Sequence, residues 1–462
     1  MKTKSILFVV CFALSIQAQA QKCDCPTVFE AVIKKVANNY LQLKQMQIAG
    51  KANDYEQRVK AYRQKVKSIA SDQCTAFLND FLDYFQDRHL FVFEYPKYTE
   101  QQLEVHKKRI QSQKKTTEQL SQMVQQQQGK HPLIGYWTDG KSLLAIITEQ
   151  EKYNAYILKN KDDASKTGEL LAQLHANQHR IKATYNTYKY TPRYIWGGIY
   201  KENTSLRFSG GIAWTKVKNA QSAIFAPKLP TIQKLDDHNT LFTIPSFSVD
   251  YKKFVQLVKA NRKLLLNSKN LIFDIRGNTG GNAVYFTFLD MYANQTLKGG
   301  QGLVLASKAT KRYFEQFAKR NKIYKPVVKR ITANMGAIVD GPQYPNRKYK
   351  AARKSKIKNV AILTDHGCMS AAESFILHSK GASTKVTTFG SPTAGVIDYT
   401  SVTVLKLPTS GDQRIYFGFP TSSLHKQIPQ NGYNKTGIKP DVPIENSEKD
   451  KIKFIRAYFN RK

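Results

Sequence analysis

The sequence has no apolar run long enough to cross a bilayer. Residues 6–16 are apolar, but they are about half of the roughly 20 residues that a membrane helix needs, and no other stretch approaches that length. Two lysines precede this run, and a small-x-small motif follows it at 18–20. These features predict a signal peptide over residues 1–20, a mature chain that starts at Gln21, and export to a periplasm or beyond.

Cysteine is also scarce. Of the five cysteines, one lies inside the predicted signal peptide, and the others are Cys23, Cys25, Cys74 and Cys368. Export permits disulfides, and two cysteines separated by one residue rarely bond to each other. We therefore expect Cys74 to pair with Cys23 or Cys25, and we interpret Cys368 as a small turn residue.

Acidic residues are few, 34 against 72 basic ones, and the formal net charge is +38. The imbalance is strongest over residues 308–358, where sixteen Lys and Arg accompany only Glu315 and Asp340. Such a segment favours contact with a polyanion such as lipopolysaccharide, acidic polypeptide or nucleic acid. A solvated basic surface is the alternative, and no specific nucleic-acid recognition motif accompanies the charge.

A chain of 462 residues exceeds one ordinary core, so two or three domains are expected. Residues 21–92 show the periodicity of three short amphipathic helices, and 93–131 are a polar, glutamine-rich helical spacer. Short alternating runs rich in Tyr, Ile and Trp over 132–222 predict a small antiparallel β domain. Alternating strands and helices over 223–462 predict a mostly parallel α/β core.

Ser370 follows a buried strand pattern at 360–363 and a polar turn, and a helical pattern begins directly after it. A serine at a strand-to-helix turn exposes its hydroxyl and directs the first helical amides at the group that the hydroxyl attacks. This is the geometry of a nucleophile. Ser370 and Glu373 also have the spacing of a capping box, and by itself this stretch favours the simple helix cap.

A second strand is followed by a glycine-rich turn at 274–281, DIRGNTGG. Its glycines expose backbone amides that could hold an oxyanion or a phosphate. The spacing differs from that of a dinucleotide fingerprint, and no Gly-Lys-Ser/Thr follows, which excludes a nucleotide P-loop.

Four segments together resemble the signature of one serine peptidase family. They are LIFDIRGNTGGN, VAILTDHGCMSAAESF, FGSPTAG and GIKPDVPI, in that order over about residues 235–446. The family includes C-terminal processing proteases, tricorn protease and interphotoreceptor retinoid-binding protein. The resemblance implies a crotonase-like α/β spiral core with Ser370 as nucleophile and an oxyanion hole built from Ala371 and the Gly280-Gly281 turn. It implies no metal and no organic cofactor.

The base that activates the serine differs between branches of this family. The C-terminal processing branch uses a lysine in a segment resembling T-x-G-K-G, but the matching position here holds Val396. The tricorn-like branch takes a histidine from far upstream, and Asp87-Arg88-His89 matches the D-x-H pattern of related exported proteins. We expect His89 to be the general base; His366 and His425 are alternatives, and His89 could instead only end a helix.

The acid that orients the histidine is the least defined member of the site. Tricorn-like relatives carry a glutamate shortly before the G-x-x-P-D segment, yet residues 421–436 contain no Asp or Glu. We take Asp398 as the substitute, with Asp87 and Asn434 as alternatives.

Together with the predicted signal peptide, the resemblance implies an exported serine endopeptidase acting on peptides or unfolded proteins. No Gly-Leu-Gly-Phe-like loop of a PDZ domain is found. A catalytically inactive binding protein for an apolar ligand or a polyanion remains the alternative. An acyl-CoA enzyme of the crotonase type is disfavoured by the export signal.

Overall fold

The computed structural model describes residues 24–461 apart from several short segments. The segments left out are 71–72, 96–97, 178–179, 201–202, 210–211, 223–228, 350–354, 410–413, 425, 427, 429–431, 435, 446 and 449. The predicted signal peptide, Gln21, Cys23 and His425 lie outside the described residues. Within them, no helix is both long and apolar enough to cross a membrane.

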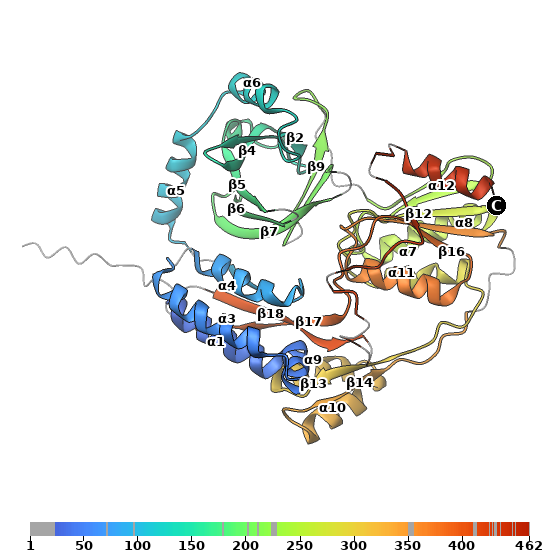
Figure 1. Ribbon diagram of the computed structural model, residues 1–462. Helices are drawn as coiled ribbons and strands as arrows, with labels where there is room; N and C mark the ends of the chain where they lie inside the picture. The colour runs from blue at the N-terminus through green and yellow to red at the C-terminus, as the bar shows by residue number, and fades with distance from the viewer. Residues whose placement is uncertain are drawn as a thin grey trace, which may run out of the picture.

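The N-terminal helices pack on a sheet that the C-terminal part of the chain completes (Figure 1). Their apolar faces form one core with strands β1, β17 and β18, and β1 pairs antiparallel with β18. This helical unit therefore shares its core with the rest of the protein. The elements are α1 (Cys25–Asn39), α2 (Leu41–Ile48), α3 (Asn53–Lys65), α4 (Cys74–Leu82), β1 (Phe91–Tyr95), β17 (Tyr399–Lys406) and β18 (Arg414–Ser423).

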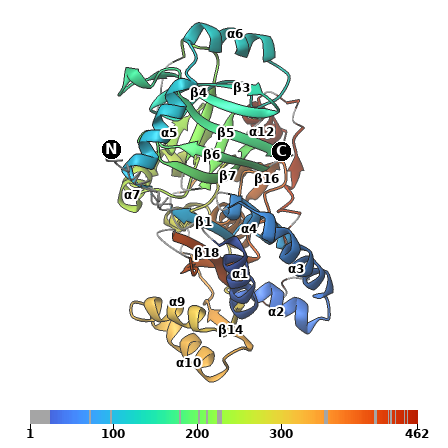
Figure 2. The same cartoon turned by 90° about the vertical axis from the view of Figure 1, so that its left-hand side faces the viewer.

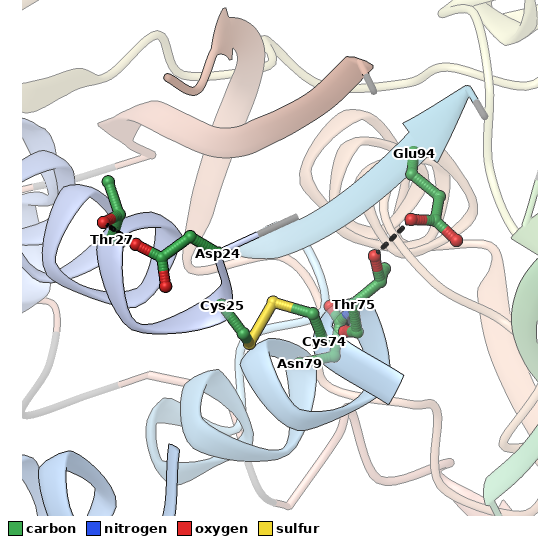
Figure 3. Close-up of a disulfide and its surroundings, with 7 residues drawn as sticks. All are labelled: Asp24, Cys25, Thr27, Cys74, Thr75, Asn79 and Glu94. Atoms are coloured by element: carbon green, nitrogen blue, oxygen red, sulfur yellow. Dashed lines mark hydrogen bonds between the residues drawn. A yellow bond between two sulfur atoms is a disulfide. The ribbon is translucent and has the colours of Figure 1, made fainter. Parts of the chain in front are cut away.

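A disulfide joins the starts of α1 and α4 (Figure 3). It links Cys25 to Cys74, which decides between the two pairings expected for Cys74. Beside it, the Asn79 amide donates to the Val92 carbonyl and its oxygen accepts from the Val92 N–H. Because Asn79 bonds the free edge of β1 in place of a further strand, α4 and β1 are fixed to each other.

Residues 135–217 close into an eight-stranded antiparallel barrel, which α6 covers on one side (Figure 2). Its interior is apolar and holds Trp137 and Trp214, whereas Trp196 lies outside it and packs against Phe91 of β1. The barrel thus contacts the helical unit through aromatic side chains. Its elements are α5 (Glu100–Ser112), α6 (Thr117–Gln127), β2 (Gly135–Thr138), β3 (Ser142–Glu149), β4 (Lys152–Asn160), β5 (Leu170–Asn177), β6 (Arg180–Asn186), β7 (Pro192–Tyr200), β8 (Ser205–Phe208) and β9 (Ala213–Val217).

The α/β core is built on a six-stranded sheet in the order β10-β11-β12-β15-β16-β19, parallel from β11 onward. Apolar clusters lie on both of its faces, one with α7 and α11 and the other with α12. These elements are β10 (Thr231–Lys234), β11 (Asn239–Thr243), α7 (Tyr251–Ala260), α8 (Arg262–Asn267), β12 (Asn270–Asp274), β15 (Asn359–Thr364), α11 (Ala371–Ala382), β16 (Val386–Gly390), β19 (Val442–Pro443) and α12 (Lys451–Asn460).

Residues 301–343, which include most of the basic segment 308–358, lie at the lower edge of Figure 1. Strands β13 (Gln301–Leu305) and β14 (Ile338–Gln343) extend the sheet of β1 and β18, and helices α9 (Lys308–Ala318) and α10 (Lys325–Ala333) pack beside them. The two acids of this segment are neutralised, because Glu315 contacts Lys311 and Asp340 contacts Lys426.

Candidate active site

Ser370 lies at the junction of β15 and α11 and is the N-cap residue of α11. Its backbone has φ 56° and ψ −117°, whereas an ordinary N-cap serine has extended backbone angles. A positive φ in a residue with a side chain costs on the order of 1–3 kcal/mol and persists where the surroundings enforce it. A helix cap does not require this conformation, but a sharp strand-to-helix turn that exposes a nucleophilic serine does.

Glu373 is the group that enforces the turn. This side chain is fully buried, and it accepts hydrogen bonds from the amides of Ser370, Gly395 and Val396 at 2.8 to 2.9 Å. The hydroxyl of Thr393 also donates to it. Burial raises the pKa of Glu373, while these donors oppose the rise. In the C-terminal processing branch a lysine would stand at position 396. Here Val396 instead contributes a backbone amide, which donates to the Glu373 side chain that supports Ser370.

The glycine-rich turn is bonded directly to the serine turn. One oxygen of Asp365 accepts from the amides of Gly277 and Gly367 at 2.8 and 2.9 Å, so it joins the two turns. Gly280, with φ +94°, lies so close to Ser370 that an added Cβ would be 2.9 Å from the serine Cβ. Because real Cβ atoms do not approach this closely, residue 280 must be glycine.

The amides expected to form an oxyanion hole differ in their bonding. The Gly280 N–H donates to the side-chain oxygen of Asn278 at 2.9 Å and is occupied. Among the described residues, no acceptor takes the N–H of Gly281 or of Ala371. Two unengaged amides therefore remain next to the serine, one from each turn.

His89 is the imidazole that meets Ser370. Its Nε2 lies 3.2 Å from the serine Oγ, and its Nδ1 lies 2.7 Å from the carbonyl oxygen of Tyr399. Because a carbonyl can only accept, Nδ1 carries the hydrogen, and Nε2 is left to accept the hydroxyl proton. The side chain is therefore oriented as a proton acceptor for Ser370.

Asp87, and not Asp398, is the acid beside this histidine. Its Oδ1 accepts from the His89 N–H at 2.9 Å and lies 4.0 Å from His89 Nδ1, and its Oδ2 accepts from Tyr40 at 2.9 Å. Burial raises the pKa of Asp87. Asp398 accepts instead from the amides of Tyr433 and Asn434. The expected orienting contact from Asp398 is therefore wrong, because the Tyr399 carbonyl occupies the Nδ1 position and the Asp398 oxygens hold a loop.

The other sequence candidates have different positions. His366 is exposed on the turn before the serine. Neither polar atom of the Asn434 amide has a partner among the described residues, and it is not bonded to His89. Cys368 is a buried free thiol that donates to the Ile275 carbonyl, and burial raises its pKa far above the ordinary value. Cys368 is therefore a structural turn residue.

A cavity of about 240 Å³ lies next to the serine turn. Thr279 and Met369, which immediately precede Gly280 and Ser370, form one side of it. The outer face of the barrel and the end of the helical unit form the others. The remaining lining residues are Asn79, Asp83, Asp87, Arg88, Leu90, Phe91, Ile181, Lys182, Tyr194, Trp196, Gly197, Tyr200, Arg207, Phe208 and Ser209.

One family model matches the core of the chain. Residues 240–444 match the model described as Peptidase family S41. No curated protein sequence matches the chain significantly.

Several solved structures are similar over most of the chain. Mature CPAF complexed with lactacystin is 12% identical, over 91% of this chain and 94% of that one, with a TM-score of 0.48. A putative peptidase from Parabacteroides merdae is 13% identical, over 94% and 96%, with a TM-score of 0.43. Tricorn protease is 13% identical, over 95% of this chain and 37% of that one, with a TM-score of 0.41. The family match, rather than these distant similarities, carries the assignment.

Proposed function

Residues 240–444 belong to peptidase family S41, a family of serine peptidases, and from this we propose that the protein is an exported endopeptidase that cleaves peptides or unfolded proteins. The observation that carries the proposal is the bonding of His89: Nε2 faces the Ser370 hydroxyl while the Tyr399 carbonyl holds Nδ1. A histidine that merely ended a helix would not need both contacts.

In the proposed reaction, Ser370 attacks the carbonyl carbon of the scissile peptide bond as its proton passes to His89 Nε2. The amides of Ala371 and Gly281 donate to the oxyanion that develops, and Gly280 supplies the space for their approach. The protonated His89 then gives its proton to the leaving amine, and water hydrolyses the acyl-enzyme by the reverse sequence of transfers. The carboxylate of Asp87, 4.0 Å from His89 Nδ1, stands beside the imidazole in the place that the sequence predicts for Asp398.

The crotonase-like spiral is our proposal for the fold of residues 223–462. Its support is the repeated strand and helix order around β11, β12, β15 and β16, with both functional turns at the carboxyl ends of strands. Ligands bind at these ends in open parallel sheets. Export is proposed from the signal peptide pattern and is supported by the Cys25–Cys74 disulfide, since such bonds persist in oxidising compartments.

Contact with a polyanion through residues 308–358 is proposed as a separate property. Exposed cations cover α9, α10 and the turn between them, and include Lys308, Arg312, Lys319, Lys322 and Lys325. The proposal predicts binding to heparin that falls steeply as the salt concentration rises. A variant with three of these residues changed to Gln should bind heparin more weakly. Equal binding by that variant would reject it.

The catalytic proposal is tested with Ser370→Ala and His89→Gln. We expect Ser370→Ala to abolish peptide hydrolysis and labelling by a fluorophosphonate, and His89→Gln to lower kcat by about 10²- to 10⁴-fold. Ser374→Ala, one turn further along α11, and His366→Gln are the matched controls and should retain activity. Hydrolysis by Ser370→Ala would disprove the mechanism. Ligand binding by a wild-type protein that neither hydrolyses peptides nor is labelled would favour the inactive binding protein.

A further inference from the structure

The cavity beside Ser370 contains an arginine that the proposed reaction does not use. Arg207 lies on β8 between Leu206 and Phe208, whose side chains belong to the barrel interior. Because successive side chains of a strand point to opposite faces, Arg207 points out of the barrel, into the cavity.

The guanidinium of Arg207 has little to bind within the protein. Its Nε donates to the Ser205 hydroxyl at 3.1 Å, and no carboxylate in the described part of the chain pairs with it. Burial lowers its pKa, and no neighbouring acid opposes this effect. An arginine has five N–H donors in a planar fork, so most of the hydrogen-bonding capacity of Arg207 is unused.

Each of the other charged side chains that line the cavity, Asp83 included, has a partner. Asp87 is bonded to Tyr40 and to the His89 backbone, and Lys182 contacts Asp80 at 3.7 Å. Arg88 donates to the Tyr200 hydroxyl at 3.0 Å from the opposite wall. Among the described residues that line the cavity, Arg207 and Arg88 are therefore the cations without a carboxylate partner, and Arg207 is the one on the barrel wall.

We propose that this cavity is a substrate subsite for a carboxylate, which Arg207 binds through its guanidinium fork. The inference rests on the proposed peptidase function. A partly buried cation without a counter-charge is costly, and a carboxylate that accepts two of its N–H groups offsets that cost. The aromatic rings of Phe91 and Trp196, 5.7 Å apart, form an apolar wall for the carbon chain that carries the carboxylate.

The position of the cavity fixes which part of a peptide it receives. Met369 and Thr279 line it, and each immediately precedes a residue of the reacting centre, Ser370 or Gly280. The carboxylate therefore belongs to a residue within a few positions of the scissile bond. It comes either from an Asp or Glu side chain or from a peptide C-terminus, and both present the same group to Arg207.

Binding without catalysis tests the subsite directly. Calorimetry with the Ser370→Ala protein compares peptides that differ only as Glu against Gln near the cleavage position, and as free against amidated C-terminus. We expect one carboxylate form to bind at least about tenfold more tightly than its amide. Which pair shows the difference identifies the source of the carboxylate.

Arg207→Gln in the same background should abolish that difference, and Arg207→Lys should keep part of it because the charge remains. Arg193→Gln, an exposed arginine on the neighbouring strand β7, is the control and should keep all of it. Three results would overturn the inference. They are equal affinity for both members of each peptide pair, no binding of any peptide, and a preference for the carboxylate that survives in Arg207→Gln. Fluorophosphonate labelling of Arg207→Gln with Ser370 present shows that this variant is folded.

The same labelling separates the two proposals. A protein that is never labelled, yet binds carboxylates through Arg207, would refute the peptidase and leave the subsite standing. A protein that is labelled and hydrolyses peptides without regard to charge would refute the subsite alone.

Discussion

The Nε2 atom of His89 lies 3.2 Å from the Oγ atom of Ser370, although 281 positions of the chain separate the two residues. The histidine follows the N-terminal helices and the serine begins a helix of the α/β core, so the pair exists only while these parts are docked. The docking is made by the pairing of β1 with β18 and by the apolar core that the helices share with these strands. Features that stabilise the helical unit should therefore affect catalysis without contacting substrate.

Loss of the disulfide is the first such test. The Cys25–Cys74 bond closes a loop of 49 residues, a length for which chain entropy predicts a stabilisation of about 4 kcal/mol. Cys74→Ser removes the bond. Cys23 cannot replace Cys25 in it, because both expected pairings require Cys74. We expect a lower melting temperature and slower peptide hydrolysis, and the wild-type protein should change in the same way when a reductant is added. Cys368→Ser is the control, and its melting temperature should still fall on reduction. An unchanged melting temperature in Cys74→Ser would contradict the stabilising role.

The acid of the site is tested by comparing Asp87→Asn with Asp398→Asn. Asp87 is the carboxylate next to the His89 ring, 4.0 Å from Nδ1, and Asp87→Asn removes its negative charge. Because the Tyr399 carbonyl still fixes the tautomer, we expect kcat to fall only about 10- to 100-fold. Asp398→Asn should leave kcat nearly unchanged and reduce the free energy of unfolding by about 1–3 kcal/mol, because its new NH₂ group faces the backbone donors of a loop. If Asp398→Asn lowers kcat and Asp87→Asn does not, Asp398 is the acid that supports His89.

The residues of the site differ in how well the sequence alone could predict them. Ser370 and the glycine turn are local patterns, in which a strand, a turn and a helix follow one another, so their geometry could be predicted from neighbouring residues. The role of His89 is predicted only through the resemblance of Asp87-Arg88-His89 to a family pattern. The orienting group could not be found in this way, because it is the backbone carbonyl of Tyr399, and any residue at that position supplies the same atom.

Long-range closure was the other unpredictable part of the fold. Alternating patterns over 132–222 predicted antiparallel strands, but whether β2 pairs with β9 to close a barrel depends on strand stagger and tilt, which alternation does not encode. Pairing of β1 with β18 joins residues 91 and 418, a separation at which sequence periodicity gives no register. The cavity and Arg207 lie where these two long-range arrangements meet, so no local motif predicted them.

The strained backbone of Ser370 gives a prediction on stability. Ser370→Gly should be more stable to unfolding than Ser370→Ala by about 1 kcal/mol, because glycine adopts φ 56° without a Cβ clash, although it loses more entropy on folding. Both variants lack the hydroxyl, so the comparison excludes any effect of catalysis. Ser374 lies within the same helix, and there the order should be reversed: Ser374→Gly should be less stable than Ser374→Ala by about 1 kcal/mol. If Ser370→Gly is no more stable than Ser370→Ala, the surroundings do not store strain at this turn.

His378 predicts how the stability of the core depends on pH. Its Nδ1 lies 2.9 Å from the Tyr285 hydroxyl, and burial, with a smaller effect of Arg347, lowers its pKa to about 4. Between about pH 6.5 and pH 4 the unfolded chain binds a proton that the folded protein does not, so stability falls as the pH falls through this range, by about 3 kcal/mol. Urea unfolding at about pH 7 and about pH 4.5 measures the loss. His378→Asn, which keeps an acceptor near Tyr285 and cannot titrate, should lose less stability over the same range. The exposed His366, changed to Asn, should leave the loss intact, and an equal loss in all three proteins would show that other groups cause it.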